Sequence, residues 1–257
     1  MSQPLTLDVK GHVATITYNR PEKLNAMTPE MADLLKAAVA RCNADDAVRV
    51  VILTGTGKAF CAGSDIALLE TYATPWEFRN RTEYCDILRA LLKPSIAAIN
   101  GYAFGGGLEM AMSCDIRIAA ETAKLGAPEI KLGWIGGGGM TVHLAQSIGP
   151  SNAALMVMTG EPVTAAQAQA WGLVSDLTAP DALMARANEI AGQIAARAPI
   201  AAETAKANLK AAYNMPLEQA VAYERDLQTI CFATSDADEG RAAFAEKRSP
   251  NFEKRRR

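Results

Sequence analysis

Hydrophobic positions follow a period of two at the start of the chain and then form unbroken runs. Residues 5–9 and 13–18 alternate on either side of a short turn, which predicts a hairpin at the edge of a sheet. Residues 48–53 and 95–100 form almost continuous apolar runs that end in glycine turns, and residues 116–119 form a shorter one. Runs of this kind are typical of parallel strands that are buried on both faces.

Helical patterns lie between these runs and dominate the last third of the chain. Thr28-Pro29-Glu30 begins one helix, with a hydroxyl cap, a proline in the first turn and an acid near the positive end of the dipole. Residues 76–92 and 106–112 predict two more. Further helical segments lie at 140–148, 151–158, 165–171, 181–197, 201–213, 217–232 and 236–246. Alternating strands and helices predict an α/β fold with a parallel sheet, followed by a helical C-terminal region.

Composition narrows the class of protein. The 257 residues are 49% hydrophobic and 21% charged, a balance that excludes a disordered chain. A net charge of -2 provides no broad basic surface for nucleic acid, and the basic residues Lys254–Arg257 are interpreted as a solvated chain end. No apolar run reaches the length of a membrane span, and the first residues carry no signal pattern.

Cysteine and histidine usage indicates the cellular compartment. The five cysteines are scattered and odd in number, with no Cys-x-x-Cys pair, which indicates a reducing compartment without a disulfide framework. With only His12 and His143, a histidine-rich metal site is not expected. We therefore expect a cytoplasmic protein that holds no metal and binds neither a membrane nor a nucleic acid.

Several common catalytic and nucleotide-binding motifs are absent. The chain has no Gly-x-Ser-x-Gly nucleophile elbow and no His-Glu-x-x-His metal motif. Phe60 and Met110 stand where a third glycine would complete a dinucleotide fingerprint, and Ala59 stands where a phosphate-binding loop needs serine or threonine. Nicotinamide, flavin and nucleotide chemistry are thus unsupported, which leaves backbone donors and carboxylates.

The densest signal is the segment Asn100–Met112. A buried strand ends, Gly105-Gly106-Gly107 follow, and a helix begins. Glycines let the backbone approach a ligand closely, and the first turn of a helix leaves N–H groups unpaired, so this turn can aim a donor at a developing negative oxygen. Glu109 lies in that first turn. Taken alone, it is equally well explained as an acid that offsets the helix dipole.

Two further segments can complete such a site. The small residues of Ala59–Ile66 follow a buried strand, so this loop can supply a second backbone donor and form an oxyanion hole with the first. Glu129 follows Pro128, and a return of the chain could bring it beside Glu109, so that the two carboxyl groups divide acid and base roles. Taken alone, the loop is an ordinary strand-to-helix connection and Glu129 is a surface acid.

Together these segments resemble the crotonase superfamily, the enoyl-CoA hydratase/isomerase family, and within it the enoyl-CoA hydratase branch. The resemblance covers nearly the whole chain, and the order and spacing of its segments make it specific. The segments are Asn19–Ala26, Ala59–Ile66, Lys93–Ala98, Gly105–Met112, Pro128–Ile130 and Phe244–Phe252.

The resemblance implies a role for each candidate residue. The backbone N–H groups of Ser64 and Gly106 would bind the thioester carbonyl and stabilise an enolate-like transition state. Glu109 would deprotonate a water that attacks Cβ, and Glu129 would deliver a proton to Cα. The coenzyme A part of the substrate would be bound, largely through the main chain, by Lys23, Leu24, Ala62, Gly63, Ser64, Asp65 and Ile66. Coenzyme A enters only as part of the acyl-CoA substrate, and no prosthetic group is implied.

The resemblance also implies a fold and an assembly. Residues 1–195 would form a spiral core of ββα turns, and residues 196–257 a helical trimerisation region, so that the protein is a homotrimer or a homohexamer. One segment departs from the family pattern Leu-Gly-x-x-Pro-Gly-x-Gly-Gly-Thr-Gln-Arg. Gly136 replaces the proline, Met140 replaces a glycine, and Val142-His143 replaces the Gln-Arg pair. This departure leaves the preferred acyl group open.

Several functions stay open on this scaffold. The leading hypothesis is an enoyl-CoA hydratase, a lyase that adds water reversibly across the 2,3 double bond. The same oxyanion hole could serve an enoyl-CoA isomerase, an aryl-propenoyl-CoA hydratase and lyase, or a thioester hydrolase. A non-catalytic paralogue that binds coenzyme A thioesters or RNA is the alternative from another class, and the near-neutral charge and the two acids disfavour it.

Overall fold

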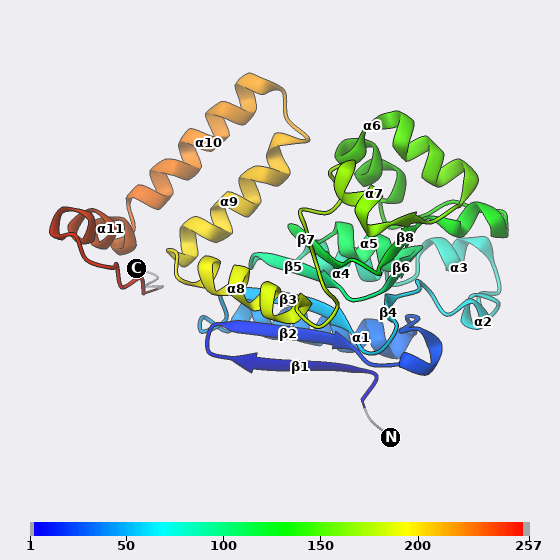
Figure 1. Cartoon of the computed structure of the whole chain (residues 1–257). Helices are drawn as coiled ribbons and strands as arrows, with labels where there is room; N and C mark the ends of the chain where they lie inside the picture. The colour runs from blue at the N-terminus through cyan, green and yellow to red at the C-terminus, as the bar shows by residue number, and fades with distance from the viewer. Residues whose placement is uncertain (1–2, 254–257) are drawn as a thin grey trace.

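A six-stranded sheet forms the centre of the computed structural model, which describes residues 3–253 (Figure 1). The basic segment Lys254–Arg257 lies outside the described residues. The strands, in their order across the sheet, are β1 (Leu5–Lys10), β2 (Val13–Tyr18), β3 (Val50–Gly55), β5 (Ser95–Ile99), β7 (Ile116–Ala120) and β10 (Asp176–Thr178). Because β1 and β2 pair antiparallel and every other pair is parallel, the predicted edge hairpin and parallel sheet are confirmed.

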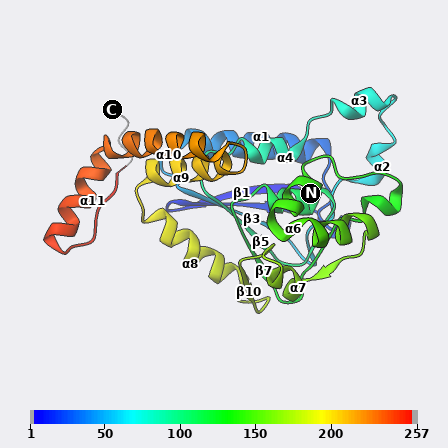
Figure 2. The same ribbon diagram turned by 90° about the horizontal axis from the view of Figure 1, so that it is seen from above.

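Both faces of this sheet are covered by helices. One face packs against α1 (Pro29–Ala44), which begins at Thr28 as predicted, since the Thr28 hydroxyl accepts the Met31 N–H at 3.2 Å. The other face packs against α8 (Leu183–Ala195), whose buried side contributes Leu183 and three alanines. Figure 2 shows the sheet between these two helical layers. Double coverage explains why the central strands β3 and β5 are apolar at nearly every position.

A second, four-stranded sheet was not predicted. Its strands are β4 (Ala59–Cys61), β6 (Tyr102–Phe104), β8 (Lys124–Gly126) and β9 (Val163–Thr164), in that order. Strands of two or three residues are too short to show a period, so the sequence pattern missed them. β4 follows β3, β6 follows β5 and β8 follows β7, and a helix comes after each pair. These repeated ββα turns confirm the predicted fold class.

The prediction of one helix over residues 76–92 is wrong. The segment holds α3 (Pro75–Arg79) and α4 (Tyr84–Arg89), preceded by α2 (Ile66–Leu69). Two caps explain the division: the Thr74 hydroxyl accepts the Glu77 N–H at 3.1 Å, and the Glu83 carboxylate accepts the Cys85 N–H at 3.4 Å. A cap with extended backbone starts a new helix and therefore ends the earlier one.

The remaining α-helices agree with the sequence pattern. They are α5 (Gly106–Met112), α6 (Met140–Thr159), α7 (Ala165–Ala170), α9 (Pro199–Ala212), α10 (Leu217–Phe232) and α11 (Ser235–Glu246). Two short 3-10 helices, η1 (Pro21–Lys23) and η2 (Pro128–Leu132), were not predicted. Inside α6, Gly149 has the non-helical angles φ 76 and ψ 160 just before Pro150, so the segment consists of the two predicted helices. Helices α9 to α11 extend away from the sheets (Figure 1).

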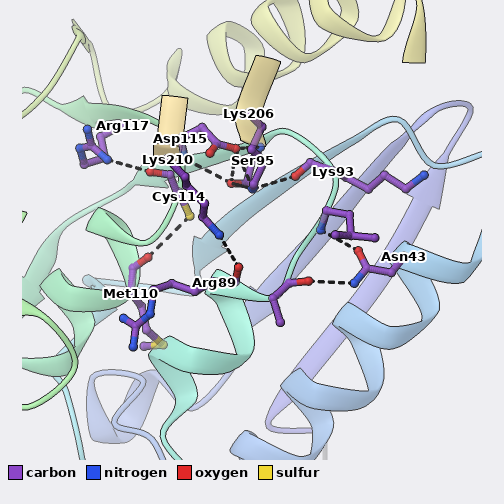
Figure 3. A network of polar contacts seen from close by, with 12 residues as sticks. Asn43, Arg89, Lys93, Ser95, Met110, Cys114, Asp115, Arg117, Lys206 and Lys210 are labelled. Carbon is purple, nitrogen blue, oxygen red and sulfur yellow. Dashed lines mark hydrogen bonds and ion pairs between the residues drawn. The ribbon is translucent and has the colours of Figure 1, made fainter. Parts of the chain in front are cut away.

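Two buried lysines anchor α9 to the core. Figure 3 shows the Lys206 ammonium group among Lys93, Ser95 and Asp115. It donates to the Lys93 carbonyl at 2.9 Å and to the Asp115 carboxylate at 2.9 Å. The Lys93 ammonium group, in turn, pairs with Glu203 of α9 at 2.9 Å. Because Lys206 is 6% exposed and Lys93 is 1% exposed, these contacts fix α9 at the beginning of β5.

Candidate active site

The two predicted backbone donors lie in neighbouring turns. Ser64 follows β4, and Gly106 is the first residue of α5. A Cβ atom on Gly63 would lie 3.1 Å from the Gly106 nitrogen, and Gly63 has a φ of 96°, so glycine is required where the two turns meet. Among the backbone hydrogen bonds of residues 3–253, neither the Ser64 N–H nor the Gly106 N–H finds an acceptor. Two unpaired donors on adjoining turns are the arrangement that an oxyanion hole needs.

Glu109 is buried one helical turn beyond these donors. The side chain is 3% exposed, and its Oε1 accepts the N–H groups of Gly138 at 2.8 Å and Met140 at 3.0 Å. Burial, with a smaller contribution from the charge of Glu129, raises the pKa of the Glu109 carboxyl to about 7, although the two N–H donors act to lower it. A carboxyl group with this pKa exchanges protons at neutral pH, as a general base must.

The glycine run that departs from the family pattern encloses this carboxyl group. A Cβ atom on Gly136 would lie 2.7 Å from Glu109 Oε1, and one on Gly138 would lie 2.7 Å from Oε2. The Cβ atom on Gly138 would also lie 2.7 Å from the sulfur of Cys85. The backbone can therefore surround the carboxylate only if these positions lack side chains, which is a local reason for the run.

Glu129 lies on the other side of the glycine turn. It belongs to η2, and its Oε1 is 3.1 Å from the position that a Cβ atom on Gly105 would take. Burial raises the pKa of the Glu129 carboxyl. Its Oε2 is buried and makes no hydrogen bond within the described part of the chain. Because the pKa of the carboxyl group is raised and one of its oxygens has no hydrogen-bond donor, the protonated form of Glu129 is favoured, and this form can donate a proton.

These groups face one pocket of about 550 Å³. Ser64, Gly106, Glu109 and Glu129 line its floor, so the four predicted catalytic residues are brought together. Its apolar wall consists of Ile66, Leu69, Phe78, Leu132, Trp134 and Ile135. A charged pair, Arg81 and Glu83 at 2.7 Å, lies on the same wall, and the charge of Glu83 contributes to the raised pKa of Glu109. A pocket of this size that combines an apolar wall with convergent polar and charged side chains is typical of a small-molecule site.

Four of the seven predicted coenzyme A residues, Ala62, Gly63, Ser64 and Ile66, line this pocket, whereas Lys23, Leu24 and Asp65 do not. The Ala62 N–H donates to the Leu24 carbonyl at 3.0 Å, which joins the η1 turn to the loop after β4. Gly63 and Ser64 continue this loop into the pocket. Lys23 and Ile66 are exposed beside it, and the carboxylate of Asp65 pairs with Arg20 at 3.2 Å. The Asp65 side chain thus holds the loop, and its backbone N–H does the same by donating to the Met27 carbonyl at 2.9 Å.

Sequence reasoning missed two residues of the site. Asn25 is fully buried, and its side-chain amide donates to the carbonyls of Ala59 at 2.7 Å and Thr56 at 3.0 Å, which fixes the loop before Ser64. Tyr84, the first residue of α4, lies in the pocket beside Ser64. Asn25 stands inside a segment of the family resemblance, which could have identified it. Tyr84 stands outside every such segment, and no pattern marked it.

Comparisons with known proteins agree with this geometry. The family model described as "Enoyl-CoA hydratase/isomerase" matches residues 8–255. An (E)-benzylidenesuccinyl-CoA hydratase from Thauera aromatica is 41% identical over 97% of this chain and 98% of its own. A probable mitochondrial enoyl-CoA hydratase from Dictyostelium discoideum is 40% identical over 96% of this chain and 90% of its own.

Solved structures of enoyl-CoA hydratases are also similar to this chain. An enoyl-CoA hydratase structure from Geobacillus kaustophilus superposes with a TM-score of 0.94 at 35% identity, covering 98% of this chain and 99% of that one. The predicted enzyme class, a hydro-lyase, is confirmed by these relatives. The match covers the sheets, the candidate site and the C-terminal helices together. The chain belongs to the enoyl-CoA hydratase/isomerase family, the crotonase family that its motifs resemble.

Proposed function

We propose that this enzyme adds water to the 2,3 double bond of a 2-enoyl-CoA thioester, with Glu109 and Glu129 as the two proton-transfer groups. One observation carries the proposal: a buried and a half-buried carboxyl group, Glu109 and Glu129, both with raised pKa values, line a single pocket with two unpaired backbone donors. A hydratase needs both a base for water and an acid for Cα, whereas an isomerase needs to move one proton within its substrate.

The thioester oxygen binds between the N–H groups of Ser64 and Gly106. Charge accumulates on this oxygen as the enolate forms, so the two donors act mainly in the transition state. Removal of one such donor in other enzymes lowers kcat by roughly 10² to 10³, or about 3 to 4 kcal/mol. The coenzyme A part then follows the rim formed by Lys23, Leu24 and Ala62, and the acyl group points to the apolar wall.

The two carboxyl groups act in sequence on the double bond. Ionised Glu109 takes a proton from water as the water oxygen forms its bond to Cβ, and the π electrons move toward the thioester to give the enolate. Protonated Glu129 then transfers its proton to Cα, and the thioester carbonyl is restored. The net change is the addition of one water, and the two carboxyl groups recover their protonation states by exchange with solvent.

The C-terminal helices support a proposal about assembly. Residues 196–257 act as the oligomerisation region of a homotrimer or a hexamer of two trimers. Large apolar side chains on α9, α10 and α11 lie open to solvent, with exposed fractions of 61% for Leu209, 75% for Leu217, 66% for Phe232 and 87% for Phe244. Exposed apolar patches of this kind mark protein interfaces. Sedimentation of the purified protein tests the proposal, and a monomer at micromolar concentration would contradict it.

Three general features of the chain bear on membrane binding, metal binding and the cellular compartment. No helix within residues 3–253 is long and apolar enough to cross a bilayer. The same residues hold no group of three or more potential metal-ligating side chains. The five cysteines are free thiols, four of them buried, which supports a cytoplasmic location for the enzyme.

Crotonyl-CoA provides the direct test of the reaction. Loss of the conjugated enoyl-thioester absorbance, with 3-hydroxybutyryl-CoA identified by mass spectrometry, is the expected result. Glu109→Gln and Glu129→Gln should each remove most of the activity and remain folded. A shifted double bond, a cleaved C–C bond or free coenzyme A as product would support the isomerase, lyase or hydrolase alternatives instead. Longer and aromatic enoyl thioesters then define the acyl group.

A further inference from the structure

Tyr84 places a hydroxyl group in the pocket that the reaction scheme above does not use. It is the first residue of α4, and the Glu83 cap orients that end of the helix. Its side chain is 8% exposed and lines the pocket together with Ser64 and Gly106. A buried tyrosine places its hydroxyl group where a polar partner is available.

That hydroxyl group lies between the two predicted donors. Tyr84 Oη is 2.9 Å from Ser64 Oγ, and either atom can donate in this hydrogen bond. A Cβ atom on Gly106 would lie only 1.8 Å from Tyr84 Oη, so the hydroxyl occupies the space directly above the Gly106 backbone. The oxygen of a thioester bound to the Ser64 and Gly106 N–H groups therefore lies within hydrogen-bonding reach of Tyr84.

The hydroxyl group also has the right protonation state. Burial raises the pKa of Tyr84 well above its usual value, so it remains a neutral donor at any pH at which the enzyme works. The hydrogen bond to Ser64 acts in the opposite direction and lowers this pKa. Either hydroxyl can donate in the Ser64–Tyr84 hydrogen bond, and the arrangement in which Ser64 donates leaves the Tyr84 proton free for another acceptor.

We propose that Tyr84 is a third hydrogen-bond donor to the thioester oxygen, and that the Ser64 side chain orients it. Ser64 then acts twice: its N–H binds the oxygen directly, and its hydroxyl directs the Tyr84 O–H toward the same oxygen. The proposal rests on the hydratase function proposed above, because the addition of water to an enoyl thioester develops negative charge on the oxygen bound at this place. Tyr84 thereby increases the stabilisation of the enolate.

The first test is Tyr84→Phe with crotonyl-CoA as substrate. The oxygen is a weak acceptor in the substrate and a strong one in the transition state, so kcat should fall by roughly 10- to 100-fold with KM changed by less than about threefold. Tyr18→Phe is the matched control, because Tyr18 is fully buried and its hydroxyl donates only to Met110 Sδ, at 3.4 Å. This control should keep the kcat of the parent enzyme.

A second readout separates enolate stabilisation from packing. Acetoacetyl-CoA is the probe, because it has no 2,3 double bond to hydrate and its enolate absorbs in the near ultraviolet. The parent and Tyr18→Phe should raise the enolate fraction of the bound thioester, and Tyr84→Phe should raise it roughly tenfold less. Ser64→Ala keeps the backbone N–H and removes the orienting hydroxyl, so it should lose severalfold in kcat. The double variant should be no slower than Tyr84→Phe alone, since both changes remove one interaction.

Three results would overturn the proposal. One is a Tyr84→Phe enzyme with the kcat of the parent, and another is a loss of kcat without a change in the bound enolate fraction, which would indicate a packing role. The third result applies if Tyr84→Phe does not fold: the proposal is then overturned by a Ser64→Ala enzyme that keeps the kcat and the bound enolate fraction of the parent. A parent that hydrates no enoyl thioester would refute the hydratase function instead, while the acetoacetyl-CoA measurement would still decide the role of Tyr84.

Discussion

Glu109→Gln should make the protein more stable at alkaline pH while it removes the activity. The pKa of this carboxyl is about 7 in the folded chain, against an ordinary value of 4.5. Between these two values the folded state binds more protons than the unfolded state, so the free energy of unfolding falls as the pH rises through this range. The ionised carboxylate is thus a destabilising group at the pH at which it acts as a base.

The size of the effect follows from the two pKa values. Their difference corresponds to about 3 kcal/mol, because one pKa unit equals about 1.4 kcal/mol. Glutamine does not titrate, yet its side-chain oxygen can still accept the N–H groups of Gly138 and Met140 that Glu109 accepts at 2.8 and 3.0 Å. The stability of the variant relative to the parent should therefore grow by about 3 kcal/mol between pH 4.5 and pH 8.

Urea denaturation followed by circular dichroism, at several pH values across this range, measures the difference directly. Groups that titrate in both proteins largely cancel when the two curves are subtracted. Glu129→Gln provides a comparison, because burial also raises the pKa of Glu129 and its effect should have the same sign. A stability difference between Glu109→Gln and the parent that is constant with pH would refute the reasoning about this carboxyl group.

Three further predictions test other parts of the site and fold. The kcat/KM for crotonyl-CoA should rise with pH as Glu109 ionises, with a midpoint near pH 7, and a midpoint near 4.5 would exclude Glu109 as the base. Gly138→Ala should lower kcat by roughly 100-fold, since its methyl group would lie 2.7 Å from Glu109 Oε2, whereas Gly137→Ala, whose nearest neighbour is 3.6 Å away, should keep most activity in the same assay. Lys206→Met should reduce the free energy of unfolding in urea by about 3 kcal/mol, because it leaves a partly buried carboxylate without its ion-pair partner, and an unchanged value would contradict the anchoring of α9.

The elements that the sequence predicted correctly are those whose cause is local. Val50–Gly55 and Ser95–Ile99 are apolar at nearly every position because both faces of the sheet are covered, and this is visible in a few consecutive residues. The helix from Pro29 was predicted from its Thr28 cap, which depends on three neighbouring residues.

The errors concern elements whose cause is distant or subtle. The four-stranded sheet pairs β6 with β4 and β8, segments of three residues each that come from separate turns of the chain. Residues 80–83 are all polar, yet a single helix was predicted across them, and the break between α3 and α4 is marked by the Glu83 cap at the start of α4. Short strands and caps carry too little periodicity to outweigh a longer pattern.

The amino-acid order was sufficient to select the chemistry: glycine turns that offer backbone donors, two glutamates, and no motif for another cofactor. It could not establish that these groups converge. Gly63 meets Gly106 across two turns, the donors to Glu109 come from Gly138 and Met140, and Tyr84 arrives from a third segment. The raised pKa values and the third proposed donor depend on burial and on distances through space, and these exist only once the chain has folded.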